Sequence, residues 1–402
     1  MQKYQNWLIA GFMIVFVMQL RVAKLSSSVA NKIQIALAEK NESYSKQLQI
    51  LKTLRDCSIM ENYSVEGYVG SGQGTAVVDV TQIDTGLKYV AKVVLDIDNS
   101  YSRCRKEEII EKLSNDGISY VNKFIQKKRF TDRIQTEDFY SCVLILEKAG
   151  EALDKNLLFP KFDGKSKIEI QNTKIENSKK LVRFFGRVIQ SFAELHVKAK
   201  VLHGDIRPEN IMVNKKEISK DNFDLIPVII DFGLRLVNKS GKDIKNDLLR
   251  YTKGYRLPQM IEKIKVDGKS FEESWEDNSN EYIFSKDFIE DVYALGKTIE
   301  NVLKFQTNFI DNDICEMLRL KDLYLQMMQK KEGANKKQYI SKEDPIPNMQ
   351  QVLTNFLDKM KRCVEIERKN KSLRYVPDEV NEEFIKQASK SLESLRSKVP
   401  II

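Results

Sequence analysis

Three polar side chains follow two apolar runs near the middle of the chain. Asp205 and Asn210 lie in the segment Val201-Leu-His-Gly-Asp-Ile-Arg-Pro-Glu-Asn-Ile-Met-Val213, and Asp231 ends the next apolar run, before Phe232-Gly233. Asn and Asp oxygens suit Mg²⁺, a hard cation that prefers oxygen ligands in octahedral geometry. A further carboxylate can orient a hydroxyl group and accept its proton. A lone Asp beside Gly would indicate only a turn, but this ordered set is what phosphoryl transfer from a nucleotide needs.

The segment resembles the catalytic loop of eukaryotic protein kinases, His-Arg-Asp-x-Lys-Pro-x-Asn, followed by their metal-binding Asp-Phe-Gly. The resemblance implies that Asp205 is the catalytic base and that Asn210 and Asp231 hold Mg²⁺. Two positions depart from the pattern: Gly204 stands where the family has Arg, and Arg207 stands where it has Lys. Arg207 keeps a positive charge near the transferred phosphate, although its planar fork differs from an ammonium group.

A glycine-rich stretch precedes this segment and ends in a strand-like pattern. Its glycines fall at 70, 72 and 74, so the third arrives one residue earlier than in the family pattern Gly-x-Gly-x-x-Gly. Glycine lets backbone N–H groups approach phosphate oxygens without a Cβ in the way. Lys92, in Val90-Ala-Lys92, resembles the strand lysine that neutralises the α- and β-phosphates of ATP. The nucleotide-binding residues implied here are Gly70, Gly72, Gly74, Val77, Val90 and Lys92.

A helix is expected over residues 102–115, from the apolar face of Ile109, Ile110 and Leu113. The resemblance implies that one of its carboxylates pairs with Lys92. Glu107, Glu108 and Glu111 compete for that role, and Glu107 is our choice.

Residues 141–150 indicate a buried strand that leaves into a linker. They resemble the strand and hinge where adenine binds to the backbone. On this resemblance Leu146 is the gatekeeper residue, and Glu147 and Ala149 form the hinge.

Two later segments resemble further kinase elements. Tyr251-Thr252-Lys-Gly-Tyr255-Arg-Leu-Pro258-Gln259 resembles the substrate-docking segment Gly-Thr-x-x-Tyr-x-Ala-Pro-Glu, with Gln259 in place of Glu. Thr252 matches the threonine that contacts the catalytic aspartate in serine/threonine kinases. Asp291-Val-Tyr-Ala-Leu-Gly296 resembles the motif whose aspartate caps the backbone of the catalytic loop.

The fold class expected is α+β, a two-lobed protein kinase-like fold. Its small lobe would be an antiparallel sheet plus one helix, and its large lobe would be mainly helical. We expect a hydrophobic anchor or signal segment at 1–30, a helical juxtamembrane or linker segment at 31–60, the small lobe and hinge at 61–150, and the large lobe at 151–395. Apolar residues at three- and four-residue steps predict a helix over 180–198 that leads into the catalytic loop.

Composition excludes some classes of partner. The chain has 402 residues and a net charge of +9, but its basic residues are scattered among acidic ones, so we expect a solvated surface and no nucleic-acid partner. The five cysteines, at 57, 104, 142, 315 and 363, form no Cys-x-x-Cys pair and indicate free thiols in a reducing compartment.

Residues 7–20 are uncharged and strongly apolar, with Lys3 before them and Arg21 and Lys24 after them. At ~1.5 Å per residue they reach roughly 21 Å, short of the ~30 Å hydrocarbon core of a bilayer. We expect a retained transmembrane anchor with the enzyme facing the cytosol, because more positive charge follows the segment than precedes it. The alternative is a signal peptide, cleaved near residues 28–30, and a protein of the secretory pathway.

The function expected is that of a serine/threonine protein kinase that uses ATP and Mg²⁺ to phosphorylate protein Ser and Thr hydroxyls. Two alternatives stay open. The departures at Gly204, Arg207 and Gln259 would also suit a pseudokinase that acts as a nucleotide-binding scaffold. His203-Gly204-Asp205 also resembles the loop of small-molecule phosphotransferases.

Overall fold

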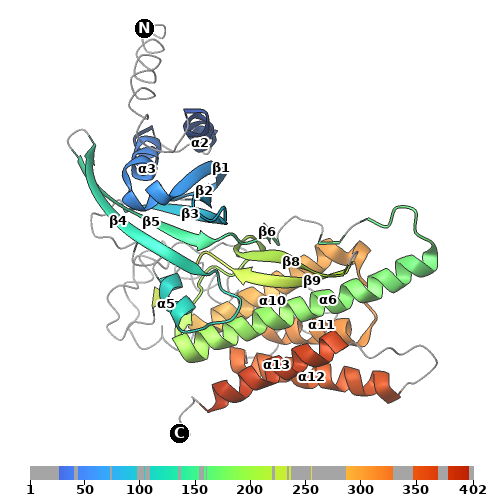
Figure 1. Ribbon diagram of the computed structural model, residues 1–402. Helices are drawn as coiled ribbons and strands as arrows, with labels where there is room; N and C mark the ends of the chain where they lie inside the picture. Colours follow the sequence, from blue (N-terminus) through green and yellow to red (C-terminus); the bar gives the residue numbers. More distant parts are fainter. Residues whose placement is uncertain are drawn as a thin grey trace, which may run out of the picture. The chain divides into compact units, whose positions relative to one another are not determined.

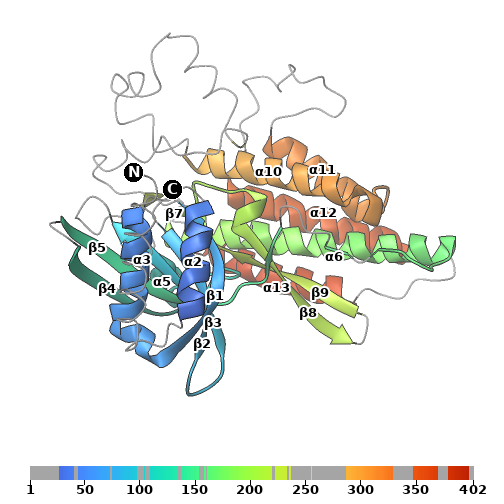
Figure 2. The same ribbon diagram turned by 90° about the horizontal axis from the view of Figure 1, so that it is seen from above.

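The computed structural model describes most of the chain, and Figures 1 and 2 show it from two directions. The described residues are 27–39, 44–72, 75–96, 104, 109–134, 137–153, 158–159, 161–219, 222–232, 235–236, 255, 287–328, 347–369 and 379–397. The chain divides into two compact units. Unit 1 extends to Ser114 and takes in Asn122–Lys148, whereas unit 2 contains Asn115–Val121 and the chain from Ala149 onward.

Unit 1 is built on a five-stranded antiparallel sheet with the order β1-β2-β3-β5-β4. Burial alternates along β2, as expected for a strand with two different faces, whereas residues 141–146 of β5 are all buried. The strands are β1 (Tyr63–Gly72), β2 (Thr75–Gln82), β3 (Lys88–Asp96), β4 (Phe124–Ile134) and β5 (Glu137–Glu147), and the helices are α2 (Ser27–Glu39), α3 (Tyr44–Asp56) and the short α5 (Ile109–Asn115).

One face of this sheet is covered by α2 and α3 (Figure 1). Apolar residues at every second position of β2, β3 and β5 share a single core with buried residues of both helices. A buried contact of 3.0 Å joins the Thr53 hydroxyl of α3 to the Ser141 hydroxyl of β5. The two helices, which contain much of the linker segment expected at 31–60, are therefore packed into unit 1, and α2 begins at Ser27 within the segment expected as an anchor. The core consists of Ala30, Ile33, Leu37, Ile50, Leu51, Leu54, Cys57, Met60, Tyr63, Val65, Ala76, Val78, Val80, Ala91, Val93, Leu95, Val143 and Ile145.

Unit 2 is mainly helical and contains one long hairpin. The helix α6 lies between the β8–β9 hairpin and the helices α12 and α13 (Figure 1). A Cβ at Gly186 of α6 would lie 2.5 Å from the Phe384 ring and 2.6 Å from the Phe356 ring. Glycine therefore permits the close packing of α6 on α12 and α13. The elements are β6 (Glu151–Ala152), α6 (Lys167–Glu194), a π-helical turn (Leu195–Ala199), β7 (Val201–Leu202), β8 (Ile211–Ser219), β9 (Asn222–Ile229), β10 (Arg235–Leu236), α10 (Asp287–Gln306), α11 (Cys315–Met327), α12 (Met349–Lys369) and α13 (Glu379–Arg396).

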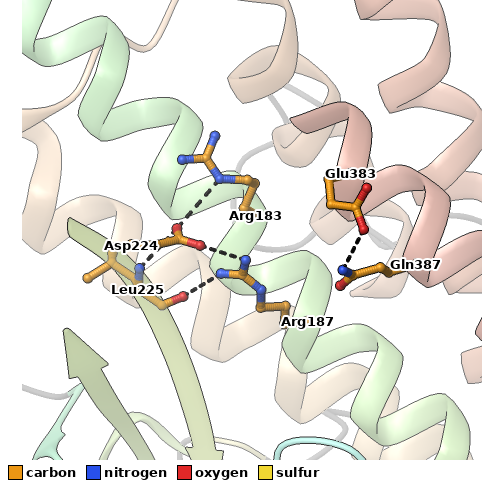
Figure 3. Close-up of polar contacts among 6 residues, drawn as sticks. All are labelled: Arg183, Arg187, Asp224, Leu225, Glu383 and Gln387. Carbon is orange, nitrogen blue, oxygen red and sulfur yellow. Dashed lines mark hydrogen bonds and ion pairs between the residues drawn. The ribbon is translucent and has the colours of Figure 1, made fainter. Parts of the chain in front are cut away.

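A buried charge cluster attaches the hairpin to α6 (Figure 3). Arg187 donates to the Asp224 carboxylate at 2.6 Å and to the Leu225 carbonyl at 2.7 Å, and the Arg183 Nε lies 3.6 Å from the same carboxylate. Burial alone would raise the pKa of Asp224, but the hydrogen bond from Arg187 and the charges of both arginines lower it below the usual value. Figure 3 also shows the surface contact in which Gln387 donates to Glu383 on α13.

Four of the five cysteines are paired, so the prediction of free thiols is wrong. Cys104 is bonded to Cys142 in unit 1, and Cys315 is bonded to Cys363 in unit 2, where the bond joins α11 to α12. The Cα–Cα distances are 5.9 and 5.7 Å, within the range of native disulfides. Cys57 remains a buried free thiol. Sequence separations of 38 and 48 residues carry no spacing signal for either pair.

The proposed membrane segment, residues 7–20, lies outside the described residues. Within the part of the chain that the structure describes, no helix combines the length and apolar character of a membrane span.

Candidate active site

Unit 1 gathers the predicted nucleotide-binding residues on one face of its sheet. The strand register pairs Gly70 with Val77, Val77 with Lys92 and Lys92 with Leu144, so these four residues form one row across the sheet. Directly paired residues point to the same face. Since residues two apart along a strand also share a face, Val90 and its partner Leu146 lie on the same side as Lys92. This is the face opposite α2 and α3.

Lys92 itself is buried, with 6% of its surface exposed. A lysine is rarely buried unless its charge has a partner. With so little of its surface exposed, Lys92 is not an ordinary solvent-facing strand lysine.

The glycine-rich stretch begins in β1, which contains Gly70 and Gly72, and precedes β2. Gly72 pairs with Thr75, so only two residues connect the strands, and Gly74 is one of these two residues outside the described part. A Cβ built at Gly70 would meet nothing within 4 Å. The surface at Gly70 is therefore open, and the backbone there can be approached.

The hinge residues lie at the end of β5 and just after it. Leu146 is buried at 4% exposure, and the Glu147 N–H donates to the Lys123 carbonyl at 2.9 Å. The Glu147 side chain is half exposed and lies 3.4 Å from the Lys123 ammonium. Ala149, the other hinge residue, is the first residue of unit 2 after β5.

Of the three glutamates considered as partners of Lys92, only Glu111 lies in the described residues. Its carboxylate binds the Lys127 ammonium of β4 at 2.5 Å. Glu111 therefore already has a cationic partner on the same unit. Glu107 and Glu108 lie outside the described residues, and so does Thr252.

In unit 2 the catalytic-loop segment follows β7, and a short 3₁₀ turn at Pro208–Asn210 brings Asn210 back to Asp205. The Asn210 Nδ2 donates to the Asp205 backbone carbonyl at 2.9 Å and to its carboxylate Oδ2 at 3.0 Å. Both bonds use the amide nitrogen, so the Asn210 Oδ1 points elsewhere. Five residues apart in sequence, the two side chains are thus direct neighbours.

Asp231 is joined to the same loop through the residue before it. The Ile230 N–H donates to the Asn210 carbonyl at 3.0 Å, and His203 Nε2 bonds the Ile230 carbonyl at 2.9 Å. Asp231 has a φ of +53°, a left-handed conformation that few non-glycine residues adopt. Such conformations persist where the surroundings impose them, and they cluster at functional sites. The structure therefore places Asp231 next to the loop of Asp205 and Asn210.

His203 is fully enclosed and braces this arrangement. Burial lowers the pKa of His203, so its ring is neutral near pH 7. The Nδ1 accepts from the Asp205 N–H at 3.3 Å, which leaves the proton on Nε2 to be donated to Ile230. The ring also packs on Phe232, with centroids 4.9 Å apart.

Asp291 holds the loop from α10. Its carboxylate accepts from the backbone N–H groups of His203 at 2.9 Å and Gly204 at 3.0 Å, and His196 Nε2 bonds it at 3.0 Å. Burial alone would raise the pKa of Asp291, but the hydrogen bond and charge of His196, with the contacts of His203, lower it. This is the capping role implied by the sequence resemblance. His196 is a further member of the brace, because its side chain contacts Asp291.

Arg207 lies beside the carboxylate of Asp205, with its Nε 3.4 Å from Oδ2. The pair is partly exposed, so the attraction is moderated by solvent. Tyr255, the described residue of the docking segment, receives a hydrogen bond at 3.0 Å from Asn301 of α10. Sequence reasoning missed Asn301, since an Asn within a helix gives no signal of its partner.

The donor set suits Mg²⁺ bound together with a nucleotide. No group of three or more His, Cys, Asp or Glu side chains that could hold a metal occurs within the described ranges. Mg²⁺ in nucleotide sites needs only one or two protein oxygen ligands, because phosphates and water supply the rest. Asn210 uses its Nδ2 for the bonds to Asp205, so its Oδ1 is the atom that could bind Mg²⁺. Asp231 follows Ile230, which bonds the Asn210 backbone, and it supplies a carboxylate.

A five-stranded sheet with a buried lysine, in one chain with a helical unit whose loop couples Asp205 to Asn210, defines an α+β kinase of the two-lobed type. The family model of the protein kinase domain matches residues 63–383. The chain belongs to the protein kinase family. The predicted fold class is confirmed.

Three relatives show how far the similarity extends. Death-associated protein kinase 2 of Mus musculus is 28% identical over 201 residues, 49% of this chain and 48% of that protein, and its Homo sapiens counterpart is 26% identical over 198 residues, with the same coverage. Serine/threonine-protein kinase prpf4B of Dictyostelium discoideum is 28% identical over 212 residues, 50% of this chain and 22% of that protein. The chain thus spans about half the length of the first two relatives that it matches.

Proposed function

We propose that this protein is an active serine/threonine protein kinase that transfers the γ-phosphoryl group of ATP to hydroxyl groups of a protein substrate. One observation carries the proposal: the Asn210 amide holds the Asp205 carboxylate at 3.0 Å, so the base and a metal ligand are fixed by each other. A scaffold that only binds nucleotide has no need of an oriented base. The match to protein kinases that are named as serine/threonine enzymes supports the choice of acceptor.

Each residue has a stated task in this proposal. Asp205 orients the acceptor hydroxyl and takes its proton, while Arg207 supplies positive charge beside it. Asn210 and Asp231 hold Mg²⁺, which neutralises charge on the phosphates when it is bound. Lys92 binds the α- and β-phosphates, and the backbone of the glycine-rich turn cradles them.

The central test is Asp205→Asn in the purified full chain, measured as transfer of labelled phosphate from Mg²⁺-ATP to a mixed Ser/Thr peptide library. Asparagine keeps the size of the side chain but cannot accept the proton, so transfer should fall by at least ~100-fold. Asp84→Asn, in the exposed turn between β2 and β3, is the matched control and should leave the rate unchanged. Equal rates for wild type and Asp205→Asn would remove Asp205 from its role.

The same assay separates the alternatives. Nucleotide binding without Asp205-dependent turnover, with Mg²⁺ present, would select the scaffold. Phosphate transfer to amino alcohols in preference to peptides would select a small-molecule phosphotransferase. Phosphoamino-acid analysis of the peptide products tests the preference for Ser and Thr over Tyr.

We also propose that the kinase domain folds in an oxidising compartment. The protein has two disulfides, one in each unit, and disulfides are rare in proteins of the cytosol. They favour the secretory alternative over a cytosol-facing enzyme. Asn62-Tyr-Ser64 is an N-glycosylation sequence, and Asn62 is exposed. Glycosidase treatment of the protein from its own cells should lower its mass, and the Asn62→Gln variant should show no such change. Free thiols at Cys104, Cys142, Cys315 and Cys363 in that protein would reject the proposal.

A further inference from the structure

We propose that the Cys104–Cys142 disulfide is a positioning element for nucleotide binding: it fixes the segment at Cys104 to the Lys92 face of the sheet in unit 1. The inference rests on the proposed kinase function, and it adds a residue pair that the kinase resemblance does not contain. Both cysteines are completely buried.

The register of the sheet places the disulfide on the face that carries Lys92. Cys142 pairs with Val94, and Leu144, two residues along β5, pairs with Lys92. Since residues two apart share a face, Cys142 and Lys92 lie on the same side of the sheet. Val93 and Val143, between them, point the other way into the core with α2 and α3.

Cys104 lies directly over this part of the sheet. Its Sγ is 3.9 Å from the Val94 carbonyl oxygen, and Val94 is two residues from Lys92 on the same strand. The disulfide therefore reaches the nucleotide-binding face at the position next to the buried lysine. Cys315–Cys363, by contrast, joins two helices of unit 2.

Several contacts hold Cys104 and α5 within unit 1. The disulfide ties Cys104 to β5, and Glu111 of α5 pairs with Lys127 of β4. Ile109, Ile110 and Leu113 of α5 are buried. Loss of the disulfide therefore removes the covalent tie between Cys104 and β5, on the face of the sheet that carries Lys92.

The experiment compares the double variants Cys104→Ser/Cys142→Ser and Cys315→Ser/Cys363→Ser with wild type, each as the full chain. The first should show a KM for ATP raised by about tenfold, with the KM for the peptide unchanged, because only nucleotide positioning is lost. Cys315→Ser/Cys363→Ser is the matched control: it loses one disulfide and some thermal stability but keeps the KM for ATP. Equal KM values for ATP in wild type and the first variant would overturn the proposal, as would equal increases in both variants.

Reduction supplies a readout that a purely structural disulfide would not give. Because Cys104 and Cys142 are completely buried, each protein is refolded from urea with and without dithiothreitol. Refolding with dithiothreitol should raise the KM for ATP of wild type and of Cys315→Ser/Cys363→Ser, but should have no further effect on Cys104→Ser/Cys142→Ser. Cys57 does not complicate this test, because it is already a free thiol. A response to dithiothreitol that persists without Cys104 and Cys142 would contradict the proposal. If Cys104→Ser/Cys142→Ser does not fold, the wild-type and control responses to reduction decide the question.

Binding of a fluorescent ATP analogue with Mg²⁺, measured on the same proteins, distinguishes this inference from the proposed function. If wild type binds the analogue but transfers no phosphate, the proposed function fails, while a weaker affinity in Cys104→Ser/Cys142→Ser alone still supports the positioning role. Alkylation of the unfolded, unreduced chain gives a direct check. Labelling of Cys104 and Cys142 in that chain would show that the pair is not formed and would end the proposal.

Discussion

The side-chain amide of Asn210 donates to the carboxylate of Asp205 at 3.0 Å and to the Asp205 backbone carbonyl at 2.9 Å. Asn210 thus holds both the backbone of the loop at Asp205 and the orientation of the Asp205 carboxylate. The same amide nitrogen cannot bind a cation, so metal binding falls to the oxygen at the other end of the group.

Replacement of Asn210 by Ala should lower the rate of phosphate transfer by at least ~100-fold, because the orientation of Asp205 and an oxygen ligand are lost together. Asn210→Asp keeps an oxygen ligand but places a second carboxylate beside Asp205. We expect it to retain more activity than Asn210→Ala at high Mg²⁺ and to require more Mg²⁺ for half-maximal rate. Titration of the rate with Mg²⁺ measures both effects. The same Mg²⁺ dependence in Asn210→Asp and wild type would exclude Asn210 as a ligand.

Replacement of Asp291 by Ala should destabilise unit 2 and reduce activity, because the backbone N–H groups of His203 and Gly204 would lose their acceptor. Each buried donor left without an acceptor costs about 1–3 kcal/mol. Asp291→Asn should also fail to replace the carboxylate, since an amide cannot accept at both of its ends. Urea unfolding and the kcat for a peptide substrate measure the two consequences. Full activity of Asp291→Ala would show that the loop keeps its shape without this brace.

The stability of the protein should depend on Asp224 in a pH-dependent way. The two arginines lower the pKa of Asp224 in the folded protein, so its stabilisation is complete above the unfolded pKa of ~3.9 and is lost as the pH falls through the folded value. Asp224→Asn should therefore lower the free energy of unfolding by about 3–5 kcal/mol at pH 7, with a difference that narrows below about pH 4. Urea unfolding at several pH values measures this, with Asp84→Asn as the exposed control. A constant difference across that range would mean that the carboxylate charge is not what stabilises the hairpin.

The sequence was sufficient to predict the helices and strands that depend on residues close together in the chain. The apolar runs before Asp205 and Asp231 form β7 and the β8–β9 hairpin, and the step pattern of residues 180–198 lies in a helix. That helix begins earlier, at Lys167, because Ser166 and Glu169 form a capping box that stabilises its first turn.

Contacts between distant residues could not be predicted from the sequence. The partners of Cys104 and Cys315 follow 38 and 48 residues later, and Asp224 meets arginines on another element. An apolar stripe on α2 or α3 indicates that a helix face is buried, but it does not say against what. Only the fold shows that both helices cover the sheet of unit 1.

Ile33 and Ile35 of α2 provide the sharpest test of that cover. Ile33 is fully buried in the core shared with the sheet, whereas Ile35 is 60% exposed on the same helix. Ile33→Ala should lower the free energy of unfolding by about 2–5 kcal/mol, because it removes buried methyl groups and leaves a cavity. Ile35→Ala should change it by less than about 0.5 kcal/mol, as is usual for surface positions. Urea unfolding of the two variants measures the difference. Equal, small effects would mean that α2 does not stabilise unit 1, and a chain that starts at residue 61 would then fold as stably as the full chain.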